Sequence, residues 1–421
     1  MAHELAVWLF SDRVGALSLV NGRVTFRYDA DWLANPASVP LSHSLPLRQE
    51  SFDDHAARPF FAGLLPEGRL RDLIAQRVHV SRQNEFGLLD SIGGECAGAV
   101  TLMRAEKGAP NNPADGHVLW LDDAGLAGVL EELPRRPMLA GKDGLRLSLA
   151  GAQDKLPVVF DGQRIGLPQD GYPSTHIMKP EIVEVEDSVS NEAFCLELAG
   201  VMRLPVANAQ VRSVGDKRFL LVERYDRVPV GAGPARRLHQ DDFCHALGVV
   251  SELKYQNEGG PSLADCFGLI RTATRPSVTN LVSMLDYVIF NTLVGNHDAH
   301  GKNFSLLYAG ATPTLAPLYD VLCTAIYPRL TEKMAMKLGG KYKFTEVTEK
   351  HWERFAEETG LGKAQMRKRV MVLASSLPIA AVKLAAGSEE YAASEVVGRI
   401  VELIERRAGL VVKRLTAGTD T

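Results

Sequence analysis

The sequence predicts an α+β protein with a β-rich first half and a mainly helical second half. Short alternating patterns and hairpin signals lie before residue 226, and long stretches with apolar residues at helical spacing follow it. A loop rich in Ala, Gly, Pro and Asn at 105–115 sets apart a further β-rich unit at the N-terminus. We therefore expect three parts, an N-terminal subdomain at 1–105, a β-rich lobe at 116–226 and a helical lobe at 227–421.

The composition is that of an ordinary globular chain and excludes some classes of protein. With 421 residues, 46% of them hydrophobic, the chain can bury a large core. Its net charge of −4 disfavours broad binding to nucleic acid, and the basic clusters at 135–136 and 406–414 are expected to be solvated. The five cysteines are scattered without any C-x-x-C spacing, so neither a disulfide framework nor a structural zinc site is expected. A reducing cytoplasm fits this pattern.

No segment of the sequence predicts export or membrane insertion. The first residues lack the basic and apolar regions of a secretory signal. The longest apolar helix candidate, at 281–294, contains Asp286 and is shorter than the roughly twenty residues that cross a bilayer. We expect it to be a buried core helix.

The N-terminal subdomain is expected to begin with a small antiparallel sheet. Asn21 and Gly22 favour a tight hairpin between its second and third strands. A helical stretch follows at 60–89, with Pro66 in an entry turn, and residues 93–100 are expected to return to a strand. The three first strands are expected at 5–10, 15–20 and 24–28.

In the second lobe, Asp161 and Gly162 favour a hairpin between two strands, and residues 176–179 are expected to form the next strand. A helix is predicted at 190–203 and a later strand at 219–223. The helices expected after that lie at about 240–248, 262–273, 278–294, 349–359, 363–375 and 389–415.

The chemistry-bearing pattern is Asp298-x-His300-x-x-Asn303, followed by Asp320 after a short strand and a loop. An aspartate can accept the proton of an attacking hydroxyl, and the oxygens of Asn303 and Asp320 are suited to Mg²⁺. His300 could bond to a phosphoryl group or lock the loop backbone. The same residue types also cap helices and turns, but the position between an apolar helix and a strand favours phosphoryl transfer.

A second cluster of small residues lies at 148–155, immediately before a strand. Small residues let backbone N–H groups approach phosphate oxygens closely. The segment is neither a Walker A sequence nor a G-x-G-x-x-G loop, and a tight turn would also explain it. The residues expected to contact ATP from this loop are Ser148, Ala150, Gly151, Ala152, Gln153 and Lys155.

Two further parts of the sequence are candidates for binding ATP together with that loop. Lys179 ends a predicted strand and could reach the phosphates, with Glu192 of the following helix as its partner, although a strand-end lysine is commonly just solvated. Glu223 and Tyr225 follow another strand at the expected junction of the lobes. Backbone groups there could bond to an adenine edge, but an ordinary charged turn is an equal explanation.

Taken in order, these motifs resemble the HipA-type serine/threonine kinases, the toxins of bacterial HipBA modules. The resemblance covers nearly the whole chain. Its segments are 61–68, 93–100, 148–155, 178–180, 191–192, 222–227, 254–255, 259–261, 298–304 and 318–320.

The resemblance implies a two-lobed protein-kinase-like fold with a phosphoinositide-kinase-like C-lobe and an additional β-rich N-terminal subdomain. It implies ATP and Mg²⁺ as cofactors and autophosphorylation at Ser148, which displaces the phosphate-binding loop and switches activity off. The implied roles are catalysis for Asp298 and His300, metal binding for Asn303 and Asp320, and ATP binding for Lys179, Glu223, Tyr225 and His300.

The resemblance also implies partners. The substrate would be an aminoacyl-tRNA synthetase, typically glutamyl-tRNA synthetase, whose phosphorylation stalls translation and leads to dormancy and persistence. A HipB-like helix-turn-helix antitoxin would bind the kinase, so that DNA is contacted only indirectly. Tyr225 stands where the family commonly has Phe, and no motif identifies the protein substrate. Two alternatives are a small-molecule or lipid kinase, and a non-catalytic co-repressor that only binds an antitoxin.

Overall fold

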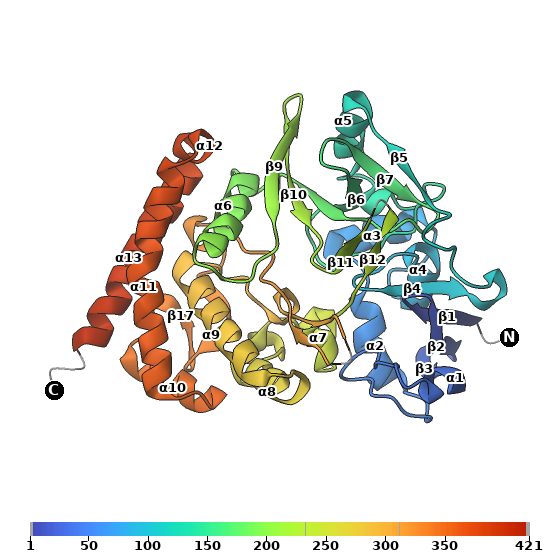
Figure 1. Ribbon diagram of the computed structural model, residues 1–421, viewed down its shortest axis with the longest axis horizontal. Helices are drawn as coiled ribbons and strands as arrows, with labels where there is room; N and C mark the ends of the chain where they lie inside the picture. The colour runs from blue at the N-terminus through green and yellow to red at the C-terminus, as the bar shows by residue number, and fades with distance from the viewer. Residues whose placement is uncertain (1–2, 232, 311, 418–421) are drawn as a thin grey trace. The chain divides into compact units, whose positions relative to one another are not determined.

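The computed structural model describes residues 3–231, 233–310 and 312–417, with α-helices and several β-sheets (Figure 1). The chain forms two compact units, each built from three segments. Unit 1 comprises Met1–Pro180, Arg212–Glu252 and Leu306–Pro313. Unit 2 comprises Glu181–Val211, Leu253–Ser305 and Thr314–Thr421.

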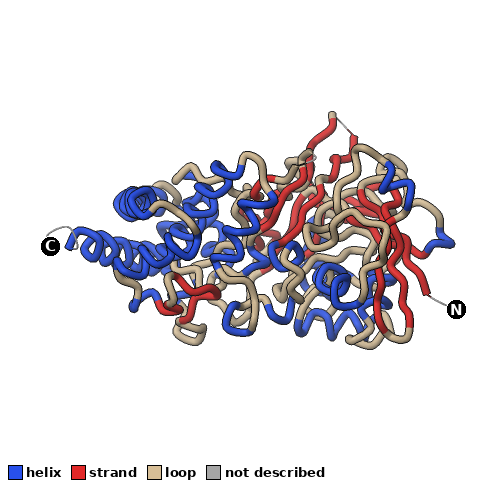
Figure 2. Tube along the Cα trace, turned by 90° about the horizontal axis from the view of Figure 1, so that it is seen from below, coloured by secondary structure: helices blue, strands red, loops and turns tan. Residues whose placement is uncertain are grey.

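Unit 1 begins with the predicted antiparallel sheet, whose strand order is β3-β2-β1-β4. In Figure 2, red strands lie next to the marked N-terminus. Asn21 and Gly22 join β2 to β3 as a two-residue hairpin, and both have positive φ, 52° and 76°. An Asn-Gly pair adopts this turn at little cost, so the predicted hairpin is confirmed. The strands are β1 (His3–Leu9), β2 (Asp12–Val20), β3 (Arg23–Tyr28) and β4 (Val100–Arg104).

Two expectations for this region were wrong. The helical stretch at 60–89 is divided into three helices, because Pro66 and a turn near Ser81 interrupt the helical hydrogen bonds. The strand expected at 93–100 starts only at Val100, because Glu95 bonds instead to the backbone of residues 146–148. The helices are α1 (Ala30–Ala34), α2 (Asp54–Gly63), α3 (Gly68–Arg77) and α4 (Glu85–Ile92).

The second sheet of unit 1 has the order β5-β7-β6-β8-β10-β9, and β9 enters the unit at Arg212. Asp161 closes the β6–β7 hairpin by accepting bonds from the backbone N–H groups of Gln163 and Arg164, as the Asp-Gly pair predicts. The strands are β5 (His117–Trp120), β6 (Leu156–Phe160), β7 (Ile165–Gln169), β8 (His176–Pro180), β9 (Ala209–Val214) and β10 (Lys217–Glu223).

Shorter elements complete unit 1. They are α5 (Asp123–Glu132), β11 (Arg227–Val230), β12 (Gly233–Arg237), β13 (His239–Asp242) and α7 (Phe243–Ala246), and β14 (Ser305–Tyr308) enters the unit at Leu306.

Unit 2 is mainly helical and is centred on α9 (Ser277–Val294), whose second half is almost entirely buried. Asp286 on this helix is paired with Arg369 of α11, which removes the cost of burying its charge. In Figure 1, α11 and α13 run side by side at the C-terminal end. The helices are α6 (Ser188–Val201), α8 (Leu263–Ala273), α10 (Glu349–Thr359), α11 (Lys363–Ala386), α12 (Glu389–Ala393) and α13 (Glu395–Ala417).

The expected helix at 389–415 is broken at Ser394, whose hydroxyl accepts a bond from the N–H of Val397 and starts α13 anew. The helix expected at 363–375 continues to Ala386. The strands of unit 2 are β15 (Thr314–Leu315) and the antiparallel pair of β16 (Lys333–Leu338) and β17 (Lys341–Lys343).

Two helices in the described ranges, α9 and α11, are long and apolar enough to cross a membrane. The core helix of any folded domain can meet the same criterion. The most apolar window of α9 is 67% buried, as the sequence predicts for a core helix, whereas that of α11 is 28% buried.

Candidate active site

The segment after α9 is a tight loop that carries the predicted catalytic residues. Gly295 ends the helix with φ 81°, a conformation that glycine adopts without strain. Asn296 then donates from its Nδ2 to Asn291 Oδ1 at 2.8 Å, and its Oδ1 accepts from the N–H of Asp298 at 3.0 Å. These bonds orient the backbone that presents Asp298 and His300.

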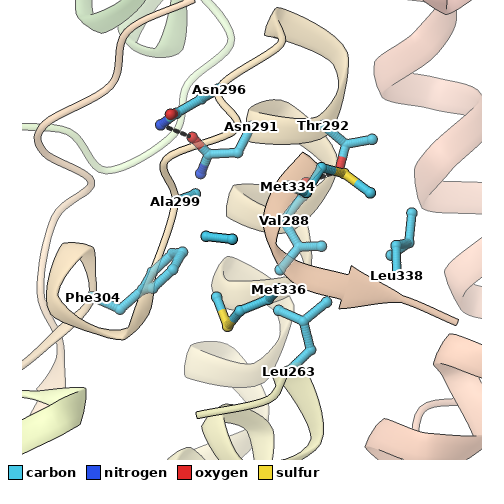
Figure 3. Close-up of a pocket in the computed structure, with 11 residues that line it drawn as sticks. Leu263, Val288, Asn291, Thr292, Asn296, Ala299, Phe304, Met334, Met336 and Leu338 are labelled. Atoms are coloured by element: carbon cyan, nitrogen blue, oxygen red, sulfur yellow. Dashed lines mark hydrogen bonds between the residues drawn. The ribbon is translucent and has the colours of Figure 1, made fainter. Parts of the chain in front are cut away.

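The loop is held against unit 2 by its apolar residues. A small pocket of about 30 Å³ is lined by Ala299 and Phe304 of the loop together with residues of α8, α9 and β16. Figure 3 shows Ala299 and Phe304 facing Val288 and Met336. Because Ala299 and Phe304 pack on this apolar wall, the polar residues between them are kept in one place.

His297 anchors the loop through both ring nitrogens. Its Nδ1 lies 3.0 Å from Thr331 O, and its Nε2 lies 2.8 Å from Nη2 of Arg407, which can only donate. The imidazole must therefore be neutral, with its proton on Nδ1. Burial lowers the pKa of His297, and the neighbouring Arg407 lowers it further.

Arg407 was expected to be solvated, and that expectation is wrong. It is 8% exposed and also donates to Thr292 O at 2.7 Å, so it joins α13 to the end of α9 and to the loop that presents Asp298. Burial lowers the pKa of Arg407 to about 10.

Asp298 projects from the loop with a side chain that is 53% exposed, within reach of an incoming molecule. Its Oδ2 lies 4.0 Å from Nε2 of His300. Its Oδ1 accepts a hydrogen bond of 2.6 Å from the hydroxyl of Tyr255, whose ring stands edge-on to His300. Sequence reasoning did not single out Tyr255 as a site residue.

Asn303 and Asp320 are brought together, as the sequence predicts. Asn303 Nδ2 donates to Asp320 Oδ2 at 2.8 Å. Asn303 Oδ1 accepts from the N–H of His300 at 3.2 Å, so the same amide fixes the loop. Asp320 has φ 58°, a backbone conformation that a non-glycine residue adopts only where its surroundings hold it.

The residues on both sides of Asp320 are held firmly. Before it, Leu318 exchanges two backbone bonds of 2.9 Å with Pro205 and Ala207, and the hydroxyl of Tyr319 donates to Lys302 O at 2.7 Å. After it, the backbone of Cys323 is bound by Asn191 of α6. These anchors can maintain the strained conformation of Asp320.

Asn191 is 0% exposed and is fully used in this anchor. Its Oδ1 accepts from the N–H of Cys323 at 2.7 Å, and its Nδ2 donates to Cys323 O at 3.1 Å and to the hydroxyl of Tyr327 at 2.9 Å. The hydroxyl of Tyr327 in turn donates to Glu186 O. The Asn-Glu motif at 191–192 pointed to this residue, but it did not predict that Asn191 anchors the backbone of Cys323.

The donor set of Asn303 and Asp320 fits Mg²⁺. One carboxylate and one side-chain amide, in contact with each other, supply the hard oxygen ligands that Mg²⁺ takes from proteins. Among the residues that the structure describes, no group of three or more His, Cys, Asp or Glu side chains could hold a metal ion by itself.

In unit 1, the predicted phosphate loop is fastened at its start to the N-terminal subdomain. Ser148 is 0% exposed, its hydroxyl donates to Leu64 O at 2.8 Å, and its N–H donates to Glu95 O at 2.9 Å. Further along, Gly151 O accepts from the N–H of Glu67 at 3.0 Å. The serine itself is thus inaccessible in this conformation.

The middle of the loop is more accessible. Gly151 has φ 109°, and a Cβ at this position would lie 2.7 Å from Nζ of Lys155, so the lysine folds back over the glycine. Ala150 and Gln153 are half-buried, and Ala152 is exposed. The ammonium of Lys155 therefore lies beside the backbone of Gly151, on a segment with small residues.

Lys179 is buried on β8 and lies opposite Leu220 of β10, so it is not the solvated lysine of the simpler interpretation. Glu223 ends β10 and is exposed, and the hydroxyl of Tyr225 donates to Gln240 Oε1. Lys179 and Glu192 belong to different units, and their pairing stays a prediction.

The predicted hinge is fixed by a buried charge network. Arg224 is paired with Asp226 at 2.8 Å, and Arg227 bonds to Glu95 at 2.7 Å. Burial alone would raise the pKa of each carboxyl group, but the arginines, including Arg237, hold the pKa of Glu95 and Asp226 below the usual range. The network ties residues 224–227 to the N-terminal subdomain.

The structure thus brings together Asp298, His300, Asn303 and Asp320 in unit 2. In unit 1 it joins the loop at 148–155 and the hinge at 223–227 through Glu95. The residues that sequence reasoning missed are Tyr255, His297, Asn191, Glu95 and Arg407.

Known proteins resemble this chain over nearly its whole length. Residues 147–381 match the family model described as HipA-like C-terminal domain, and residues 5–103 match that of the HipA N-terminal domain. A putative kinase, Y4mE, from Sinorhizobium fredii is 44% identical over 93% of this chain and 94% of its own length.

Two further similarities come from Shewanella oneidensis. The serine/threonine-protein kinase toxin HipA of this organism is 29% identical over 87% of this chain and 85% of its own length. A solved structure of the complex of HipA, HipB and operator DNA covers 99% of both chains with a TM-score of 0.86 and 26% identity.

Proposed function

The chain belongs to the HipA family and is a serine/threonine-protein kinase, and from this premise we propose an ATP- and Mg²⁺-dependent toxin of a type II toxin–antitoxin module. The observation that carries the proposal is the contact of Asn303 with Asp320. Asn303 lies on the loop that also presents Asp298 and His300. The two units would correspond to the lobes of a protein-kinase-like fold.

Asp298 would accept the proton of the attacking serine or threonine hydroxyl and orient its oxygen toward the γ-phosphorus. Its exposed carboxylate supports this role. His300, held beside it, would contact the transferred phosphoryl group. Asn303 and Asp320 would hold Mg²⁺, which would offset the negative charge of the phosphates when bound.

On unit 1, the loop at 148–155 would bind the phosphates of ATP through backbone N–H groups, with Lys155 and Lys179 adding positive charge. Glu223 and Tyr225 would hold the adenine edge. The buried network behind residues 224–227 supports this role, because it fixes the backbone that would meet the base.

Ser148 would be the autophosphorylation site. Its burial and its bond to Leu64 O mean that the hydroxyl must leave its present place before it can be phosphorylated. A phosphate adds about two negative charges and could not return to that buried position, so the loop would stay displaced and activity would stop.

We further propose the partners that the family resemblance implies. A HipB-like antitoxin would bind the chain and link it indirectly to operator DNA, and the similarity to HipA in its solved complex with HipB and operator DNA supports this. The substrate would be an aminoacyl-tRNA synthetase in the cytoplasm, where phosphorylation would inhibit translation. All five cysteines are buried and outside disulfides, which suits a reducing compartment.

The test is transfer of label from [γ-³²P]ATP to proteins of a bacterial lysate. The Asp298→Asn variant should lose about 10²- to 10⁴-fold in rate, the usual contribution of a general base. Asp216→Asn, a change at an exposed turn, is the matched control and should keep the full rate.

The outcome also separates the alternatives. Label that appears only in metabolites would indicate a small-molecule or lipid kinase. An absence of label with the wild-type chain would favour a non-catalytic co-repressor. Full protein labelling by the Asp298→Asn variant would refute the role of this aspartate.

A further inference from the structure

Tyr255 lies in a loop between two short 3₁₀ turns ahead of α8, far in sequence from the catalytic loop. Its hydroxyl donates to Asp298 Oδ1 at 2.6 Å, a short bond of the kind that an ionised acceptor forms. Its ring stands edge-on to His300, with centroids 5.2 Å apart and an interplanar angle of 82°. One side chain therefore touches both residues of the proposed catalytic pair.

The backbone of this loop is itself fixed. The carbonyl of Tyr255 accepts from the N–H groups of Glu258 and Gly260, each at 2.9 Å. A Cβ on Gly260 would lie 2.2 Å from Leu253 O, so the closure of the loop requires glycine. Gln256 Oε1 accepts from the N–H of Lys337 at 2.6 Å and joins the loop to β16. Tyr255 thus approaches Asp298 from a rigid support.

Asp298 gains from such a support because its side chain is 53% exposed. A solvated carboxylate on a loop has several rotamers, and only some direct an oxygen at an acceptor hydroxyl. A bond from a fixed phenol restricts that freedom before the substrate arrives. Orientation of this kind raises the rate of the chemical step rather than the affinity for substrate.

We propose that Tyr255 is a positioning residue for phosphoryl transfer, which holds the carboxylate of Asp298 in the orientation that accepts the proton of the substrate hydroxyl. This inference rests on the proposed function. In the step, the acceptor oxygen bonds to the γ-phosphorus, the bond from that phosphorus to ADP breaks, and the acceptor proton passes to Asp298. Tyr255 keeps its own proton throughout.

The first experiment compares wild type with Tyr255→Phe, which removes only the hydroxyl. The expected result is a fall of about tenfold in kcat for labelling of the lysate protein that the wild type phosphorylates, because a misdirected catalytic group costs roughly that much or more. The KM for ATP and the Mg²⁺ dependence should stay within about twofold, since Tyr255 would act on orientation and not on binding.

The matched control is Tyr391→Phe. Tyr391 also donates its hydroxyl to a carboxylate, Glu197 Oε2 at 2.8 Å, and lies in the same unit on α12. This variant loses an equivalent bond elsewhere and should retain the wild-type kcat. A matching fall in kcat would mean that the effect of Tyr255→Phe is general destabilisation.

A double-mutant cycle with Asp298→Asn tests whether Tyr255 acts through Asp298. If it does, adding Tyr255→Phe to Asp298→Asn should change the residual rate by less than about twofold, because the group to be oriented is gone. An additive tenfold loss would overturn the inference, and so would full or increased activity of Tyr255→Phe alone. An inactive wild type would instead refute the proposed function, so the two failures are distinguishable.

Discussion

His297 is a buried residue next to Asp298, the proposed catalytic residue, and it supports the loop without a proposed contact to substrate. It accepts from Arg407 and donates to Thr331, so the loop at 296–303 is joined both to α13 and to the segment before β16. Protonation of Nε2 would place a second donor against Arg407 and break this bond. A fall in pH is therefore expected to weaken the hydrogen bonding that holds the loop at 296–303 in place.

The direction of the pH effect follows from the lowered pKa of His297. At pH values below its ordinary pKa of about 6.5, the unfolded chain binds a proton that the folded protein excludes. The stability that neutral His297 contributes is thus present above this range, and it is lost as the pH falls from about 6.5 through the lowered folded value.

His297→Gln is predicted to lower the free energy of unfolding by roughly 1 to 3 kcal/mol at pH 7.5, because Arg407 loses a buried partner. The difference from wild type should shrink at pH 5, because the wild type loses part of this contribution once the pH falls below about 6.5. Urea unfolding at the two pH values measures this, with His55→Gln, at an exposed position, as control. An equal difference at both values would contradict the assignment.

At the level of residues, the candidate site residues that lie within local sequence motifs could be predicted. Residues that reach the site from distant segments of the chain could not. Asp298, Asn303 and Asp320 could be named because the spacing of hard oxygen ligands is itself the signal. Tyr255 and Asn191 could not be given roles, since their partners lie 43 and 132 residues away. Only the fold brings such pairs together.

At the level of elements, Glu95 connects the two parts of unit 1 that are proposed to hold ATP. Its backbone O accepts from Ser148, at the start of the phosphate loop, while its side chain bonds to Ser174 and to the arginines of the hinge. The N-terminal subdomain is therefore part of the support of both elements. Secondary structure was predicted well where hairpin residues or long apolar repeats determine it. The Gly-rich residues 93–99, in contrast, did not predict that Glu95 would connect these two parts of unit 1.

Glu95→Gln tests that connection. The change removes one of two carboxylates that face the buried Arg224 and Arg227 and the half-buried Arg237, so positive charge without a partner remains in the interior. Loss of one partner of a buried ion pair typically lowers the free energy of unfolding by roughly 3 to 5 kcal/mol. The measurement is thermal or urea unfolding of the purified chain.

The control for Glu95→Gln is Glu106→Gln, which removes an exposed carboxylate 4.0 Å from Arg104. Exposed pairs contribute little, so a change of no more than about 1 kcal/mol is expected. Equal effects of the two substitutions would show that the network around Glu95 does not support unit 1.

At the level of the whole molecule, the proposed work is divided between the two units. The residues proposed to bind ATP, apart from His300, lie in unit 1, and those proposed for catalysis and metal binding lie in unit 2. The chain passes repeatedly from one unit to the other, so neither is a simple continuous half of the sequence. That interleaving was not predictable, because composition changes only once, near residue 226, whereas the segment with α6 leaves unit 1 much earlier.

The central claim is that Asn303 and Asp320 hold the metal ion of a bound nucleotide. The most direct measurement is anomalous diffraction from crystals grown with Mn²⁺ and a non-hydrolysable ATP analogue. We expect a peak about 2.1 Å from Asn303 Oδ1 and from a carboxylate oxygen of Asp320, with the γ-phosphate beside Asp298. A bound nucleotide whose metal peak lies away from both side chains would contradict it.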